Sequence, residues 1–234
     1  MRKSTTVLMR KDALGSAARL SASVTKSVSD MARAGRSPQD RGMPETPAHP
    51  LLSLTSRQLY GSRTVLIFGE VTTELAESVS AQLLALSAAG PEPIRVLLHS
   101  PGGHVEAGDT IHDVLRFVKP IVRVVASGWV ASAGALIYCA VPHPHRLALP
   151  NTRFLLHQPL GGVGGPASDV EIEARQIMLM RERLNRIFAE ATGQPYDKLL
   201  RDTDRNHWLS APEALEYGLV SRIVESETDV TPEA

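Results

Sequence analysis

Residues 94–126 read IRVLLHSPGGHVEAGDTIHDVLRFVKPIVRVVA, and this stretch decides the fold. A short apolar run from Ile94 to Leu98 is followed by a helical pattern from Val105 to Val118 and by a second apolar run from Ile121 to Ala126. The two runs have the length of buried strands, whereas the middle segment repeats its apolar residues at three- and four-residue steps. Two strands joined by a helix pair in the same direction, so the stretch predicts a mainly parallel sheet with crossover helices.

The same alternation continues on both sides of this stretch. Before it, the apolar run from Thr64 to Phe68 leads into a helical pattern that Thr72 or Thr73 caps and Gly90 closes. After it come three further elements: a long amphipathic helix from Ser168 to Thr192, a capping box from Ser210 to Glu213 and a strand from Leu219 to Val224. The fold class is therefore α/β. Because the long helix exceeds what a crossover needs, we expect it to project from the body and to pack on a neighbour.

The composition is that of an ordinary globular chain. Of the 234 residues, 43% are hydrophobic and 21% are charged, which is enough for one substantial core. The formal net charge is +0, whereas binding to nucleic acid or to a membrane surface normally needs a basic field, so we expect neither partner. The single cysteine, Cys139, excludes an intramolecular disulfide, and its apolar neighbours predict a small buried side chain. A reducing, cytoplasmic location fits.

The first 50 residues differ from the rest of the chain. They contain no aromatic residue and carry nine basic residues against four acidic ones. Such a segment cannot bury enough apolar surface to order itself, and it lacks the apolar stretch of a secretory signal. We therefore expect a disordered or removable leader over 1–50, a folded domain over 51–225 and a flexible tail over 226–234.

One uncharged run has nearly the length of a membrane span. Val124 to Pro142 carries no charged residue, and a bilayer is crossed by about 20 apolar residues. The run is only mildly hydrophobic, and Gly128 is expected to divide it into a strand and a helix. We therefore expect no membrane span here.

Two sharp turns carry residues that packing alone does not explain. Ser100-Pro-Gly-Gly103 follows a strand, and its glycines free backbone N–H groups to face an anion or oxyanion, although an ordinary turn has the same composition. In Gly128-Trp-Val-Ala-Ser132-Ala-Gly-Ala135, a strand enters a helix at Ser132. That position exposes the hydroxyl and directs the following N–H groups at a developing oxyanion. The alternative is a serine that only caps the helix.

A third turn, Leu155-Leu-His157-Gln-Pro-Leu-Gly-Gly162, ends an apolar strand at a histidine. A lone histidine is usually structural, but a position at a strand end beside a flexible loop suits a general base. The glycines from Gly161 to Gly165 are not a dinucleotide-binding fingerprint, because no GxGxxG follows a first strand.

In this order, SPGG, GxxASxGA, HQPLGG, RDTDR and LSAPEALEYGLV resemble the motifs of the proteolytic subunits of the Clp ATP-dependent protease, over residues 51–225. The resemblance implies a crotonase-like α/β fold with a projecting handle helix. It also implies two stacked seven-membered rings, homomeric or mixed, that enclose a chamber. There, unfolded polypeptides delivered by a AAA+ unfoldase are hydrolysed. No cofactor and no metal are implied for this chain, because ATP is used by the partner ATPase.

The resemblance also assigns roles to single residues. Ser132 resembles the nucleophile and His157 its general base. The N–H groups of Gly103 and Ala133 would form the oxyanion hole. Gly161 and Gly162 would lie along the extended substrate.

The third catalytic position departs from the family pattern. Members usually carry aspartate where this chain has Asn206. An aspartate holds the histidine tautomer and stabilises the imidazolium by its charge, whereas an asparagine can do only the first. We therefore expect reduced intrinsic activity, unless Asp204 or Asp202 takes over this role.

A second departure concerns partner docking. By resemblance, an apolar pocket on the ring face accepts a loop of the unfoldase, and its wall here consists of Arg95, Leu97, Val125, Ser127, Leu147, Leu149 and Val224. Arg95 and Ser127 are more polar than such a pocket usually is. We expect docking to be weak, altered in partner choice or supplied by another subunit type.

Three functions remain open at this stage. The first is an active serine endopeptidase, and the second is a catalytically weak or silent structural subunit, for which Asn206 is the evidence. The third is a crotonase-type acyl-CoA enzyme, which the serine and histidine and the long helix disfavour. A membrane-bound Ser/Lys protease is disfavoured too, because neither Lys119 nor Lys198 lies in a base-like setting.

Overall fold

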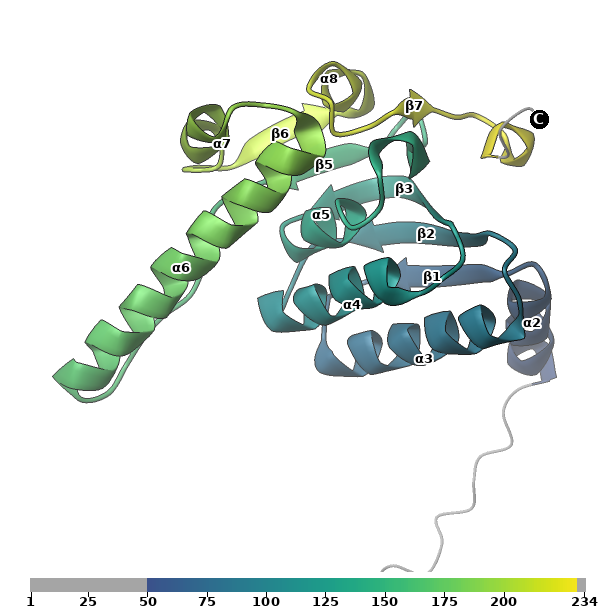
Figure 1. The fold of residues 1–234 in the computed structure, drawn as a ribbon, viewed down its shortest axis with the longest axis horizontal. Coiled ribbons are helices and arrows are strands. Elements are labelled where there is room, and N and C mark those ends of the chain that lie inside the picture. Colours follow the sequence, from purple (N-terminus) through teal and green to yellow (C-terminus); the bar gives the residue numbers. More distant parts are fainter. Residues whose placement is uncertain (1–49, 231–234) are drawn as a thin grey trace, which may run out of the picture. The chain divides into compact units, whose positions relative to one another are not determined.

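Residues 50–230 are described in the structure, a computed structural model, and they alternate strands and helices as the sequence predicts (Figure 1). The leader expected over 1–50 lies outside the described residues except for Pro50, which begins the first helix. By its internal contacts, the chain from Ser53 onward is one unit. The predicted α/β class is confirmed.

Seven strands of this unit form one sheet. Five strands follow the order β1-β2-β3-β4-β7, while β5 pairs with β3 and β6 pairs with β5. Every pairing is parallel except that of β5 with β6, so the carboxyl ends of the parallel strands meet at one edge. The strands are β1 (Thr64–Phe68), β2 (Ile94–Ser100), β3 (Val122–Ala131), β4 (Arg146–Ala148), β5 (Arg153–Leu156), β6 (His207–Ser210) and β7 (Arg222–Ile223).

The helices begin and end where the sequence supplies caps. Thr72 accepts the N–H of Leu75 at 3.2 Å, and Ser210 and Glu213 form the predicted capping box. Gly193 ends the longest helix with a φ of 71°. The helices are α2 (Pro50–Gly61), α3 (Thr73–Ala89), α4 (Val105–Phe117), α5 (Ala133–Tyr138), α6 (Ala167–Thr192), α7 (Tyr196–Asp202) and α8 (Ala211–Glu216), with 3-10 turns η2 (His143–His145) and η3 (Glu227–Val230).

One face of the sheet carries the main core. In β2 every second residue, Ile94, Val96 and Leu98, is fully buried, and Leu83 of α3 and Ile111 of α4 belong to the same cluster. Figure 1 shows α3 and α4 lying along the same side of β1 and β2. Because side chains alternate along a strand, the residues between these point to the opposite face.

That opposite face is only partly covered, and it is called the open face below. Leu66 and Phe68 of β1 are 38% and 48% exposed there. A second, smaller cluster lies on the same face and consists of Val125, Leu147, Val224 and Val230, with Leu149 packed against it. Val230 belongs to η3, so part of the segment expected as a C-terminal tail is buried, while residues 231–234 lie outside the described residues.

The structure corrects two expected boundaries. The strand expected to stop at Ala126 continues as β3 through Gly128, whose φ is 62°, to Ala131. The expected break at Gly128 is therefore wrong. The last strand is shorter than predicted, because the N–H groups of Leu219 and Val220 both donate to Ala214 at the end of α8. Among the helices of residues 50–230, none has the length and apolar character that crossing a membrane requires.

Several short elements and one long helix accompany the strands. The sequence does not predict α2, α7, β4 and β6, since each is short or lacks a clear period. The helix expected to begin at Ser132 is present as α5. The predicted long helix is present as α6, and its buried residues all lie in its second half. In the first half, Ile172 and Met178 are 57% and 59% exposed. This half therefore projects, as Figure 1 shows, whereas its packing on a neighbour stays a prediction.

Gly218 and Gly193 allow a matched test of the close contact between the turn after α8 and the end of α6. Both have positive φ, but a Cβ on Gly218 would lie 2.3 Å from the carbonyl oxygen of Thr192, whereas a Cβ on Gly193 would meet nothing within 4 Å. We expect Gly193→Ala to cost about 1 kcal/mol of unfolding free energy and Gly218→Ala about 3 kcal/mol or more. Urea unfolding followed by circular dichroism measures both, and equal losses would contradict the clash.

Candidate active site

The turns after β2 and β3 lie directly against each other. These strands are parallel neighbours, with Ser100 opposite Val130. A Cβ on Gly102 would lie 2.6 Å from the Cβ of Ser132, and a Cβ on Gly134 would lie 3.1 Å from the Cβ of Ser100. A side chain at Gly102 would therefore force the two turns apart.

Ser132 adopts a strained backbone conformation at the start of α5. Its φ is 55° and its ψ is −120°, which is rare for a residue with a side chain. Its N–H donates to the carbonyl of Leu155 in β5 at 2.9 Å. The side chain makes no capping hydrogen bond, so the alternative of a simple cap is not observed. The hydroxyl is left for another role.

His157 follows β5 directly and lies beside Ser132, because Leu155 pairs with Ala131 in the parallel ladder of β5 and β3. Its Nδ1 is 2.6 Å from the carbonyl oxygen of Gln158. A carbonyl can only accept, so Nδ1 carries the proton, and Nε2 of the neutral ring is free to accept one. Within the described residues, the side chains of Ser132 and His157 are not hydrogen-bonded to each other, as is common in sites without substrate.

One cavity of about 230 Å³ brings four of the predicted site residues together. They are Ser132, His157, Gly103 and Ala133. The N–H groups of Gly103 and Ala133 donate no hydrogen bond anywhere in residues 50–230, so both are available to an oxygen in the cavity. A hydroxyl, a basic ring nitrogen and two free N–H groups at one cavity are the parts that acyl transfer requires.

Asn206 lies one pair beyond the ladder of β5 and β6. The last pair joins Leu156 to His207, so the next pair of the same register would join His157 to Asn206. Opposed residues of a ladder point to the same face. Asn206 is exposed, however, and its side chain makes no hydrogen bond within the described part of the chain. The structure thus brings Asn206 and His157 into register without joining their side chains.

The two carboxylates considered as substitutes have other partners. Asp202 accepts from Lys198 at 2.7 Å and from the Tyr217 hydroxyl at 2.6 Å, and Asp204 pairs with Arg181 at 3.0 Å. Burial, together with the bond to Asp202, raises the pKa of Tyr217, so this hydroxyl stays a donor. Among residues 50–230, no carboxylate contacts His157.

The predicted substrate residues Gly161 and Gly162 are exposed and do not line this cavity. They lie in the segment between β5 and α6, where a Cβ on Gly162 would meet nothing within 4 Å. Sequence reasoning missed most of the apolar wall, although the amphipathic pattern of the long helix could have indicated its α6 members. The wall consists of Pro101, Val105, Leu136, Pro159, Leu160, Leu184 and Phe188.

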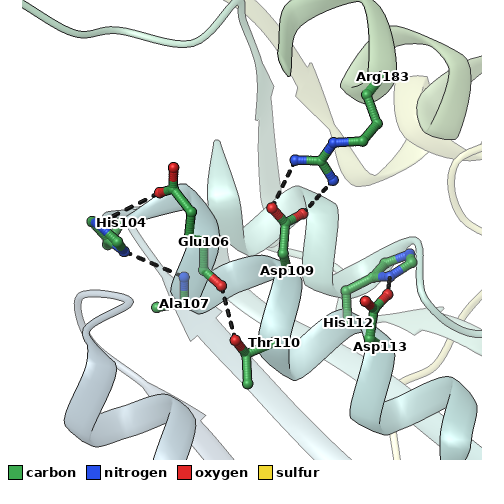
Figure 2. A network of polar contacts seen from close by, with 8 residues as sticks. All are labelled: His104, Glu106, Ala107, Asp109, Thr110, His112, Asp113 and Arg183. Carbon is green, nitrogen blue, oxygen red and sulfur yellow. Dashed lines mark hydrogen bonds and ion pairs between the residues drawn. The ribbon is translucent and has the colours of Figure 1, made fainter. Parts of the chain in front are cut away.

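An ion pair fixes this part of α6 to α4 (Figure 2). Nη1 and Nη2 of Arg183 donate to the carboxylate of Asp109, at 2.6 and 2.7 Å. These hydrogen bonds raise the pKa of Arg183, so the pair stays charged. His104, in the same network, caps α4 by accepting the N–H of Ala107 at 3.3 Å. Because Arg183 precedes Leu184 of the cavity wall, the pair holds that wall beside the glycine turn.

The residues predicted for partner docking lie elsewhere, on the open face. Three of them form the small cluster with Val230, Leu149 packs against it, and Arg95 makes an ion pair with Glu227. Leu97 is opposite Val125 in register. Part of this surface is thus covered by the C-terminal turn η3. The residues are Arg95, Leu97, Val125, Ser127, Leu147, Leu149 and Val224.

Known proteins share both the sequence and the fold. The Clp protease family matches residues 51–227. "ATP-dependent Clp protease proteolytic subunit 3" of Rhizobium etli is 60% identical over 181 residues, which cover 77% of this chain and 93% of that protein. Subunit 2 of Gluconobacter oxydans is 57% identical over 183 residues, covering 77% and 82%. ClpP1 from Listeria monocytogenes and an asparagine-to-aspartate mutant of it are both 51% identical, with TM-scores of 0.69 and 0.71; each comparison covers 76% of this chain and 99% of the solved one. The chain therefore belongs to the Clp protease family, which is a family of serine peptidases.

Proposed function

We propose that this chain is an active serine endopeptidase subunit of a barrel-shaped, ATP-dependent Clp protease. The observation that carries the proposal is the single cavity lined by Ser132, His157 and the free N–H groups of Gly103 and Ala133. Its substrates would be unfolded polypeptides delivered by a AAA+ unfoldase. ATP would be used by that partner, and no metal or cofactor takes part in the proposed chemistry.

In the proposed reaction, Oγ of Ser132 attacks the carbonyl carbon of the peptide bond while Nε2 of His157 takes its proton. The carbonyl oxygen becomes negatively charged, and the N–H groups of Gly103 and Ala133 stabilise it. The imidazolium then protonates the leaving amine, which leaves an acyl group on Ser132. Water, deprotonated by the same ring, releases the acid and restores the serine.

A backbone carbonyl takes over part of the work of the missing carboxylate. The carbonyl oxygen of Gln158 accepts a hydrogen bond from Nδ1 of His157. Gln158 is held in turn by two bonds that it donates: its N–H to the carbonyl of Thr203 at 2.6 Å, and its side-chain amide to the carbonyl of Asp204 at 2.7 Å. This arrangement fixes the tautomer that leaves Nε2 basic. A neutral carbonyl stabilises an imidazolium less than a carboxylate does, so the expected turnover is low.

A catalytically weak or silent subunit of a mixed barrel is the second candidate. It is favoured by the absence of a carboxylate on His157 within residues 50–230.

The proposed assembly is the same for both candidates. It consists of two stacked seven-membered rings in the cytoplasm, without nucleic acid or membrane partners. The exposed apolar side chains of Ile172, Met178 and Leu179 on α6 support packing of this helix on another subunit.

The role of Ser132 can be tested with a fluorophosphonate, which labels an activated serine. We expect Ser132→Ala to abolish labelling and peptide hydrolysis while leaving assembly, measured by gel filtration, unchanged. Ser78→Ala, an exposed serine on α3, is the matched control and should label like the unchanged protein. Undiminished labelling of Ser132→Ala would remove Ser132 as the nucleophile.

The close approach of the two turns predicts a large effect of Gly102→Ala. The added Cβ would displace Ser132 or the N–H of Gly103, and a displacement of about 1 Å at a reacting group costs about a hundredfold in rate. We expect kcat for a short fluorogenic peptide to fall by about that factor. Gly61→Ala, where a Cβ meets nothing within 4 Å, should leave kcat unchanged. Wild-type turnover of Gly102→Ala would show that the turn does not position the site.

Asn206 can be tested by restoring the carboxylate. In register with His157, an aspartate could accept from Nδ1 and stabilise the imidazolium by about 1–3 kcal/mol, which raises kcat about tenfold to a hundredfold. Asn206→Ala should change kcat little, because Gln158 continues to hold the ring. Asp204→Asn and Asp202→Asn are the controls. A large loss in either control, together with no gain in Asn206→Asp, would assign the supporting role to that aspartate.

A further inference from the structure

The cluster on the open face is completed by the chain's own C-terminal turn. Val230 is 6% exposed, and it packs with Val125, Leu147 and Val224, which are 3%, 2% and 1% exposed. These three come from β3, β4 and the residue after β7. Val230 is the one member that comes from the C-terminal turn η3, and it covers the other three.

The turn that carries Val230 is held by its own polar groups. The carboxylate of Asp229 accepts the N–H groups of Glu225 and Ser226 at 3.1 and 2.8 Å, and Arg222 donates to the carbonyl of Asp229. Such a turn presents two side chains to the sheet. One is the aliphatic Val230, and the other is the carboxylate of Glu227.

Arg95 receives that carboxylate. It lies on β2 on the open face, with its side chain 26% exposed, and it forms an ion pair with Glu227. Val230 and Arg95 also line the same small cavity, together with Arg123, so the apolar hollow and the cationic side chains adjoin. Arg95, which a purely apolar pocket would not contain, thus binds a carboxylate in this structure.

We propose that this part of the open face binds a partner segment with an aliphatic side chain close to a carboxylate, and that residues 225–230 are an intramolecular occupant that such a partner must displace. The partner half of this inference rests on the proposed function, in which an unfoldase docks on this subunit. Occupancy by the turn does not, because it follows from the contacts of Val230 and Glu227 alone.

The balance of forces makes the turn displaceable. One aliphatic side chain, one ion pair whose Glu227 side chain is 76% exposed and one exposed hydrogen bond from Arg222 give only modest stabilisation. Leu66 and Phe68 stay exposed on the neighbouring strand β1, so the apolar surface continues beyond the turn. A longer partner segment could cover both parts. A tethered turn acts at an effective concentration on the order of millimolar, so it weakens a competing ligand without excluding it.

The probe for the test is a synthetic peptide of residues 225–234, ESETDVTPEA, titrated onto protein with labelled valine and leucine methyl groups. Chemical shifts of the cluster methyls report binding, even when it is weak. We expect a chain ending at Val224 to bind the peptide at least tenfold more tightly than the full chain does. The full-length variant Val230→Asp, which should detach the turn, is expected to behave like the truncated chain, so the test does not depend on truncation.

Charge reversal tests the acid-binding half. In the truncated chain, Arg95→Glu should weaken binding at least tenfold, and a peptide with Glu227→Arg should restore it. Arg116→Glu makes the same charge change at an exposed position of α4 and should bind like the parent. No saturable shift in either the truncated chain or Val230→Asp, or equal binding to full and opened chains, would overturn the proposal. Binding unaffected by Arg95→Glu would overturn the acid requirement.

Fluorophosphonate labelling of Ser132 in the same samples separates this inference from the proposed function. The peptide titration reads the open face, and labelling reads the catalytic cavity. Loss of labelling with intact peptide binding would count against the peptidase proposal alone. Intact labelling without peptide binding would count against the docking inference alone.

Discussion

The candidate site depends on the contact between the turn after β2 and the turn after β3. Gly102 approaches Ser132 so closely that a Cβ would lie 2.6 Å from the serine Cβ, and Gly134 approaches Ser100 in the same way. The parallel pairing of β2 and β3 fixes the spacing of the two turns, and the glycines allow the backbones to touch. This contact places the N–H of Gly103 at the cavity that Ser132 lines. Both strands pack into the main core on one face of the sheet, so residues outside the cavity keep the two turns in place.

The sequence predicts this half of the site well because each of its signals is local. The apolar runs that end at Leu98 and Ala126, each followed by a turn of small residues, are visible without knowledge of the fold. The other half depends on long-range pairing. β6 has only four residues and no clear period, and its antiparallel register with β5 alone brings Asn206 opposite His157. In the same way, Arg146 is 2% exposed because its guanidinium donates to the carbonyls of Leu219 and Ala191, which are distant in sequence. No local pattern predicts such a burial.

The environment of His157 shows how one substitution changes the work of the backbone. The carboxylate that the family resemblance implies would orient the ring and stabilise its positive charge, whereas here the carbonyl of Gln158 orients the ring. Gln158 is held in place by the segment before Asn206, because its N–H and its side-chain amide donate to the carbonyls of Thr203 and Asp204. Orientation and charge stabilisation are thus separable functions, and this chain retains the first with main-chain atoms.

The two faces of the sheet carry the main core and the proposed docking surface. Alternation along β2 and β3 sends Val96 and Val124 into the main core, while Arg95 and Val125 point to the open face. A segment bound on the open face is therefore separated from the main core only by the sheet itself. β3 contributes Val125 to the cluster on the open face and ends at Ala131, directly before Ser132, so displacement of the C-terminal turn would alter the packing of the strand that leads to Ser132. β2 does the same through Arg95, which pairs with Glu227, so the two strands whose turns line the cavity both contact the C-terminal turn.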